Sequence, residues 1–185
     1  MTTESGKVCL VLRCATLAVA LLVAALAGAA RAGAIAEADA AVRRGDYATA
    51  LRLITPLAER GSASAQYNLG LLYERGLGVP QDFVEAARWI GKAADQGFPK
   101  AQLALGNMHS LGLGVPRDWV QAYKWFNLAA SRFPAAEAKD RDLALKLRDR
   151  VAAAMTPEET AKAQKLVREW KPKSARHEVQ RGQSR

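Results

Sequence analysis

Cysteine is scarce in this chain of 185 residues, and its absence excludes several kinds of chemistry. The two cysteines, Cys9 and Cys14, lie in the first 32 residues, so residues 33–185 contain none. Without cysteine these residues form no disulfide, offer no thiol nucleophile and build no cysteine metal site. Export to an oxidising compartment permits disulfides without requiring them, so export stays open. We therefore expect the fold to be stabilised by packing.

Histidine is equally scarce, and no motif of catalysis is present. The two histidines, His109 and His177, do not form a His-Glu-x-x-His or other metal-binding spacing. The chain has no Gly-x-Ser-x-Gly, no Ser-x-x-Lys and no phosphate-binding loop ending in Gly-Lys-Ser/Thr. Asp140 and Asp142 alternate with Arg141, a pattern typical of a solvated helix. The sequence predicts no catalytic residue, no cofactor, no metal site and hence no enzyme.

Positive charge is concentrated at the two ends. The net charge is +9, of which residues 1–32 carry +2 and residues 171–185 carry +4. The remaining residues, 33–170, carry only +3, so no nucleic-acid partner is expected. Residues 171–185 have too little apolar surface to order themselves and are predicted to be a disordered basic tail. Such a tail has three possible roles. It serves only as a solvated end, it weakly binds anionic lipid or cell-envelope polymer, or it docks on a partner.

Residues 1–32 have the pattern of a secretory signal peptide. Basic residues precede a run rich in alanine, leucine and valine at 15–27, and Ala30–Ala32 has the small-x-small form of a cleavage site. A second such triplet, Ala32–Ala34, offers an alternative cleavage site two residues further along the chain. The alternative is a membrane anchor, although the run is short for a span of about 20 strongly apolar residues. We expect a periplasmic or secreted protein, with anchoring in the inner membrane, facing the periplasm, as the alternative.

Two segments, 65–96 and 101–132, repeat one pattern at a spacing of 36 residues. Fifteen of their 32 aligned positions are identical, including the Gly-Leu-Gly-Val-Pro turns at 76–80 and 112–116. A fixed period of this size is typical of proteins built from stacked helical repeats. The sequence therefore predicts an all-α solenoid of antiparallel helix pairs.

Each repeat has the signals of two helices. Gly76 ends the first helix, because glycine tolerates the left-handed conformation of a C-terminal cap. Asp82 then caps the second helix by accepting from its free N–H groups. Gly70 and Gly106 lie inside the first helices, which indicates close approach of a neighbouring helix. The second helices have large and small apolar residues on one face: Phe83, Ala86, Trp89, Ile90, Ala93 and Ala94, then Trp119, Ala122, Trp125, Phe126, Ala129 and Ala130.

Shorter units flank the two repeats. A helix at about 35–44 and another at 46–60 precede them, without the glycine-rich loop. Two helices follow: one with Leu143, Leu147, Val151 and Ala154 on one side, and one that starts at a Thr156–Glu159 capping box and carries Ala163, Leu166, Val167 and Trp170. The predicted division is a signal peptide (1–32), an N-terminal capping helix pair (33–64), two repeats (65–100 and 101–136), C-terminal capping helices (137–170) and the tail (171–185).

The repeat resembles the Sel-one-like repeat (SLR), a relative of the tetratricopeptide repeat. The shared pattern is Ala-x-x-x-Leu-Gly-x-x-Tyr, Gly-x-Gly-Val-x-x-Asp and Ala-x-x-Trp-x-x-x-Ala-Ala. The second copy matches 36 residues after the first, but has His109 for the tyrosine and Phe133 for a closing glycine. The first copy matches at Ala65, Leu69, Gly70, Tyr73, Gly76, Gly78, Val79, Asp82, Ala86, Trp89, Ala93 and Ala94.

The resemblance implies a right-handed α-solenoid with adaptor or scaffold roles in assembling complexes. The segment Met155–Pro172 looks like the end common in exported bacterial members. The matching residues are structural in that family, so the resemblance implies no catalytic site. At its tyrosine position, His109 is expected to be a satisfied, half-buried histidine rather than a ligand or base.

Repeat arrays use the wall formed by their first helices as an extended concave groove. There, amides and a tyrosine are expected to hold a peptide backbone while Leu71 and Leu103 contact side chains. The alternative is that these are ordinary solvated helix positions. The candidate partner-binding residues are Gln66, Tyr67, Asn68, Leu71, Glu74, Gln102, Leu103, Asn107 and Ser110.

These patterns predict a non-enzymatic adaptor or scaffold of the cell envelope that binds a protein or peptide on its concave face. One alternative is a cell-envelope hydrolase, or a glycan- or peptidoglycan-binding protein, on the same scaffold. The lack of a nucleophile–base pair argues against a hydrolase. A third class is a membrane-tethered scaffold, in which the N-terminal segment stays uncleaved and membrane contact is made there or weakly by the tail.

Overall fold

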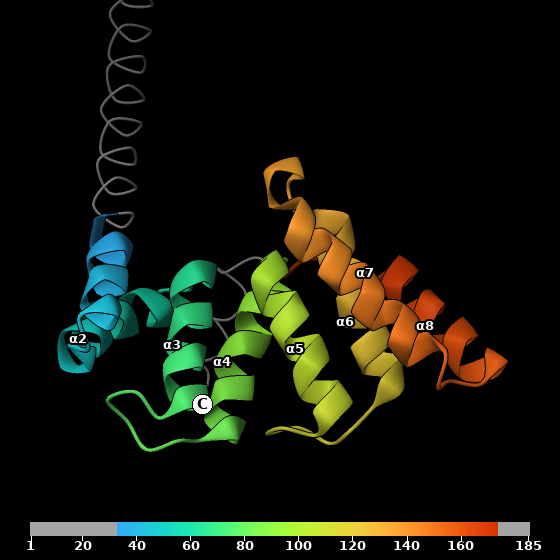
Figure 1. The fold of residues 1–185 in the computed structure, drawn as a ribbon, viewed down its shortest axis with the longest axis horizontal. Helices are drawn as coiled ribbons and strands as arrows, with labels where there is room; N and C mark the ends of the chain where they lie inside the picture. The colour runs from blue at the N-terminus through green and yellow to red at the C-terminus, as the bar shows by residue number, and fades with distance from the viewer. Residues whose placement is uncertain (1–32, 174–185) are drawn as a thin grey trace, which may run out of the picture.

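The computed structural model describes residues 33–173, and the predictions for residues 1–32 and 174–185 lie outside this range. All regular elements within it are helices, as predicted (Figure 1). No helix in the described range is both long and apolar enough to cross a membrane. The elements are a helix over 33–43, α2 (Tyr47–Glu59), α3 (Ala63–Arg75), α4 (Phe83–Asp95), α5 (Pro99–Leu111), α6 (Trp119–Arg132), the 3₁₀ turn η1 (Ala135–Glu137), α7 (Ala138–Ala152) and α8 (Pro157–Glu169).

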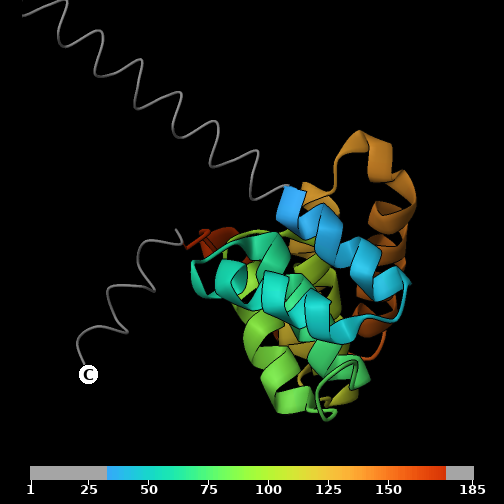
Figure 2. The same ribbon diagram turned by 90° about the vertical axis from the view of Figure 1, so that its left-hand side faces the viewer.

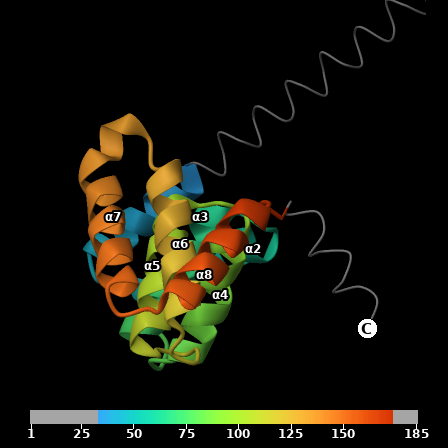
Figure 3. The same cartoon turned by 90° about the vertical axis from the view of Figure 1, so that its right-hand side faces the viewer.

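The helices stack as pairs into the right-handed solenoid that the sequence predicts. Helix α3 packs on α4 and α5 packs on α6, while α2 against α3 and α4 against α5 join successive units (Figures 1 and 2). At the end of the array, both α7 and α8 pack on α6 (Figure 3). We call the side formed by residues 33–43, α3, α5 and α7 the inner face, and the side formed by α2, α4, α6 and α8 the outer face.

The predicted helix ends are confirmed. Gly76 closes α3 in the left-handed conformation at φ 66°. The Asp82 carboxylate accepts from the backbone N–H groups of Val84 and Glu85, at 2.9 and 3.0 Å. These contacts satisfy donors that have no partner within the first turn of a helix. Short-range sequence signals therefore set where each helix of the repeat begins and ends.

The core of each repeat lies where large and small residues alternate. Trp89 and Ile90 of α4 are buried, and so are Trp125 and Phe126 of α6. The glycine inside α5 permits this packing, because a Cβ at Gly106 would lie 2.6 Å from the Phe126 ring. Real Cβ atoms are excluded from such distances, so the predicted close approach of helices is confirmed.

The glycine-rich turns rest on the preceding unit. Gly114 has φ 67°, and a Cβ on it would lie 1.8 Å from the Phe83 carbonyl oxygen at the start of α4. Gly78 has φ 74°, and a Cβ there would lie 2.7 Å from Tyr47 Cβ at the start of α2. The same contact of turn against helix start thus occurs twice, one repeat apart.

The C-terminal helices differ in detail from the prediction. Val151 of α7 is buried as expected, but Leu143 is 45% exposed and Ala144 takes the buried position instead. The predicted stripe is wrong at Leu143, because α7 turns a slightly different side toward α6, and at the exposed Ala154, because α7 ends at Ala152. Within the segment predicted as a tail, the described residues reach Lys173, whose ammonium group donates to the Asp95 carboxylate at the end of α4.

Candidate partner-binding surface

Two of the nine candidate residues are structural. Gln66 is 2% exposed and Gln102 is fully buried, so the prediction that they lie on the accessible wall is wrong. The Gln66 Nε2 group donates to the Ala58 carbonyl at 3.1 Å, and Gln102 Nε2 donates to the Ala94 carbonyl at 3.1 Å. Each glutamine therefore ties the first helix of a repeat to the end of the preceding helix and satisfies a carbonyl there.

Tyr67 lies on the inner face, where α3 meets the start of α5. Its ring packs on Phe98 with centroids 5.5 Å apart and a tilt of 57°. Burial raises the pKa of the Tyr67 hydroxyl, the nearby charge of Glu74 adds to the rise, and Arg75 opposes it. The hydroxyl thus stays protonated and can donate a hydrogen bond.

Asn68 and Leu71 line a pocket between residues 33–43 and α3. The Asn68 Nδ2 group donates to Asp39 Oδ1 at 3.0 Å across the two helices. The pocket has a volume of about 80 Å³. Its apolar residues come from three helices and the turn after α3, and Arg75 lies at its edge. The complete lining is Asp39, Val42, Ile54, Asn68, Leu71, Leu72, Arg75 and Leu77.

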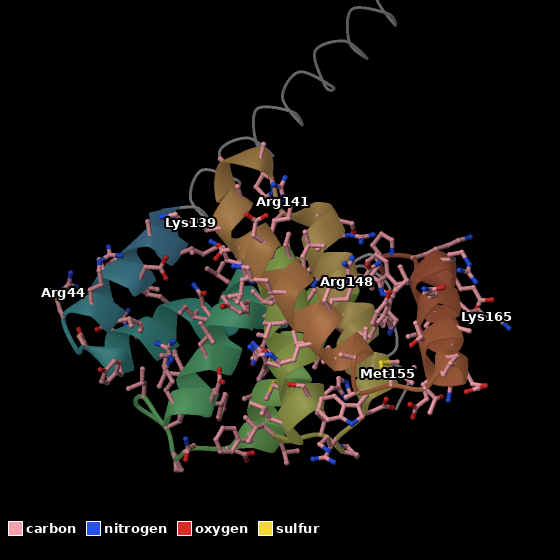
Figure 4. The ribbon with its side chains drawn as sticks, turned by 45° about the vertical axis from the view of Figure 1, so that its right-hand side comes forward. Arg44, Lys139, Arg141, Arg148, Met155 and Lys165 are labelled. Atoms are coloured by element: carbon pink, nitrogen blue, oxygen red, sulfur yellow. The ribbon has the colours of Figure 1, made fainter. Side chains whose placement is uncertain are left out.

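Further along the inner face, Leu103 of α5 is already partly buried. It packs against two apolar clusters, one containing Ala144 and the other Val151 of α7. Arg148 of α7 reaches α6, where its Nη1 group donates to Asn127 Oδ1 at 3.2 Å (Figure 4). The accessible part of the inner face therefore ends at α7.

The other candidates are half-buried and keep polar groups near solvent. Ser110 donates from its hydroxyl to the Asn107 carbonyl at 2.8 Å. Glu74 accepts at its carbonyl from Gln81 Nε2 at 2.8 Å, which leaves its carboxylate outside this bond. Of the remaining candidates, Tyr67, Asn68, Leu71 and Glu74 lie on α3, and Asn107 and Ser110 lie on α5, all partly exposed.

His109 differs from the expectation of a fully satisfied side chain. It is half-buried, but its buried Nδ1 atom has no hydrogen-bond partner among the described residues. Burial lowers the pKa of His109, while the Pro116 carbonyl and Asp118 act in the opposite direction. Within residues 33–173, no three histidine, cysteine or carboxylate side chains are grouped to hold a metal ion.

Sequence reasoning missed two residues of this surface, Asp39 and Arg75. They lie 36 residues apart, at the same position of successive first helices, and both line the pocket. That register was available in the sequence. The pocket between their helices was not, because it depends on how the short N-terminal unit packs.

Comparison with known proteins identifies the repeats. A family model described as Sel1 repeat matches residues 63–98 and 99–132. The chain contains two Sel1 repeats. Solenoids of this family are typically scaffolds for protein–protein interaction and are generally non-catalytic. The matched ranges begin two residues before the repeats predicted at 65 and 101.

Two solved structures resemble the chain. The chain is similar to a protective antigen of uropathogenic Escherichia coli strains that displays an SLR fold, with 30% identity and a TM-score of 0.69. That match covers 83% of this Sel1-like chain and 32% of the antigen, so the chain spans about a third of the antigen's length. A Sel1 repeat protein from Oxalobacter formigenes is 38% identical with a TM-score of 0.45, over 46% of this chain and 65% of that one. No curated protein matches the sequence.

Proposed function

We propose that this Sel1-like protein is an exported, non-enzymatic adaptor of the cell envelope that binds a protein or peptide on its inner face. The signal-like sequence of residues 1–32 supports export, and the family supports an interaction role. The observation that carries the proposal is the pocket between residues 33–43 and α3, beside the polar side chains of α3 and α5.

The pocket suits an aliphatic side chain of an extended peptide. A dry cavity of about 150 Å³ holds a benzene ring, so the smaller volume of about 80 Å³ fits a group of valine or leucine size. The Tyr67 hydroxyl and the Asn107 amide would form hydrogen bonds with the N–H and carbonyl groups of the bound peptide's backbone. Binding by shape and amide hydrogen bonds requires no chemistry from the adaptor.

The test is a double substitution, Tyr67→Ala with Asn107→Ala. We expect it to reduce capture of a protein partner from periplasmic extract at least tenfold in a crosslinking pull-down, because contacts at both ends of the inner face are lost. Far-UV circular dichroism should show unchanged helicity. Lys146→Ala with Lys162→Ala, at exposed positions of α7 and α8, is the matched control.

A partner captured equally by the Tyr67/Asn107 variant and the control would remove the inner face from the proposal. Capture of only glycan or lipid, lost when residues 174–185 are deleted, would replace the adaptor function by binding through the tail.

A further inference from the structure

On the outer face, the chain's own C-terminal residues pack on a surface at the ends of α4 and α6, which we call the outer groove. Trp170, directly after α8, packs edge-on against Trp125 with ring centroids 6.4 Å apart and an interplanar angle of 77°. The Arg132 guanidinium lies 4.3 Å from the Trp170 ring centroid on another side. Gly97 borders the ring, since a Cβ on it would lie at an ordinary contact distance of 3.5 Å, and its φ of 91° is what favours glycine there. One aromatic ring thus contacts three separate parts of the outer face.

Three residues after the ring, a lysine is fixed twice by one residue of α4. The Lys173 backbone N–H donates to the Asp95 carbonyl at 2.8 Å. Its ammonium group lies 2.6 Å from the Asp95 carboxylate. The backbone bond also satisfies a carbonyl at the end of α4, where intrahelical partners are missing. The groove therefore selects an aromatic ring and, three positions later, a cation.

Register between the repeats matches Arg132 with a buried amide oxygen. In the first repeat, Gln96 Nε2 donates to Gln66 Oε1 at 2.7 Å. The equivalent pair 36 residues later is Arg132 and Gln102. Gln102 Oε1 is buried without a partner among the described residues, and Arg132 lies on Trp170 instead. A buried acceptor without a partner is unfavourable. We therefore expect Arg132 to turn toward Gln102 Oε1 when the Trp170 ring is displaced.

The segment that fills the groove is also weakly tied at its end. The Lys173 side chain is 62% exposed, and ion pairs this exposed to water are weak and screened by salt. Within α8, Ala163 is the buried residue, while Val167 and Trp170 supply the partly buried apolar contacts to the core under α4 and α6. Few contacts therefore oppose exchange of this segment for another.

We propose that the groove formed by Asp95, Gly97, Trp125 and Arg132 is a second docking site, for a partner segment with an aromatic residue followed three positions later by lysine. The chain's own Trp170 and Lys173 occupy the site in cis, so a partner binds by displacing them. This site lies on the outer face and does not depend on the inner-face function. A tethered segment has an effective concentration on the order of millimolar, so the free protein keeps the groove closed to weak ligands.

The test supplies the segment in trans to the full chain. The probe is a fluorescently labelled peptide of residues 166–173, and the open variant is Trp170→Ala with Lys173→Glu. Fluorescence anisotropy should show saturable binding to the open variant and at least tenfold weaker binding to the wild type. Replacing the peptide's tryptophan by alanine, or its lysine by glutamate, should weaken binding at least tenfold. Lys165→Glu, which removes a cation from the exposed side of α8, is the matched control and should behave as the wild type (Figure 4).

Equal affinity for wild type and open variant, or no saturable binding to a folded open variant, would overturn the proposal. Circular dichroism establishes folding. If the double substitution unfolds the chain, Lys173→Glu alone replaces it. That variant should bind the peptide and exchange the amide hydrogens of α8 at least tenfold faster than the wild type. Adding Asp95→Lys should restore slow exchange by reversing the ion pair. A Lys173→Glu protein that neither binds the peptide nor exchanges faster would equally refute the docking site.

Discussion

His109 places an imidazole in the second repeat where the first repeat has a tyrosine. Tyr73 occupies the same position one repeat earlier, where its ring packs partly buried on the core. In the second repeat the buried Nδ1 atom has no partner among the described residues, and burial lowers the pKa of the ring. The folded state therefore favours the neutral imidazole, and the unfolded chain binds a proton more readily.

This difference predicts a loss of stability in mild acid. The free energy of unfolding should fall as pH drops below about 6.5, the ordinary histidine pKa, toward the lower pKa of the folded state. His109→Tyr should remove this fall in the free energy of unfolding with pH, because tyrosine does not titrate between pH 7.5 and 5. Urea unfolding of both proteins between pH 7.5 and 5 measures it. Parallel curves for the two proteins would show that His109 is not the group responsible.

Individual side chains also mark the limit of prediction from the sequence. Helical spacing alone places Gln66 and Gln102 beside the core, where either a buried or an exposed position fits. What buries them is the end of the preceding helix, whose carbonyls at Ala58 and Ala94 need donors. That need arises from tertiary packing, which helical spacing does not reveal. The predicted surface therefore included the buried amides of Gln66 and Gln102 along with accessible ones.

Whole helices were predicted more reliably, because their ends are set by nearby residues. The signals at Gly76, Asp82 and Thr156 act within one turn, and each works as expected. The orientation of α7 depends instead on its packing against α6. Helical spacing predicts a buried Leu143, whereas the fold buries Ala144. The contacts made after α8 could not be predicted for the same reason, since they join residues 78 positions apart.

Helix α8 offers a direct test of such a local signal. The Thr156 hydroxyl accepts from the Glu159 backbone N–H at 3.2 Å, and the Glu159 carboxylate accepts from the Thr156 N–H at 2.9 Å. Thr156→Ala should lower the free energy of unfolding by about 0.5–2 kcal/mol, measured by chemical denaturation, because one capping bond is lost. Thr156→Ser should retain most of it. Equal losses in both variants would mean that the methyl group, not the cap, stabilises the helix.

At the scale of the molecule, packing runs from neighbour to neighbour. Ile54 belongs to an apolar cluster formed by residues 33–43, α2 and α3. Val151 packs with Ala122 and Phe126 at the other end of the array. In an array of this kind each unit contacts only its neighbours, and stability approximates a sum of local terms. The two ends should therefore respond independently to substitution.

Ile54→Val and Val151→Ala test this independence. We expect losses of about 0.5–1.5 kcal/mol for the first and about 2 kcal/mol for the second, from the buried methyl groups removed. Equilibrium denaturation of the double variant should give their sum to within about 0.5 kcal/mol. A larger coupling term would show that the array folds as one inseparable core.

The glycine turns separate the shape of this array from its surface chemistry. At Gly114 the turn rests on the backbone of Phe83 and Val84, and at Gly78 it rests on the side chains of Tyr47 and Leu51. These contacts between successive units involve the start of the preceding second helix and not the residues on α3 and α5. Evolution is free to rewrite the inner face for a new partner while the bend of the groove stays the same.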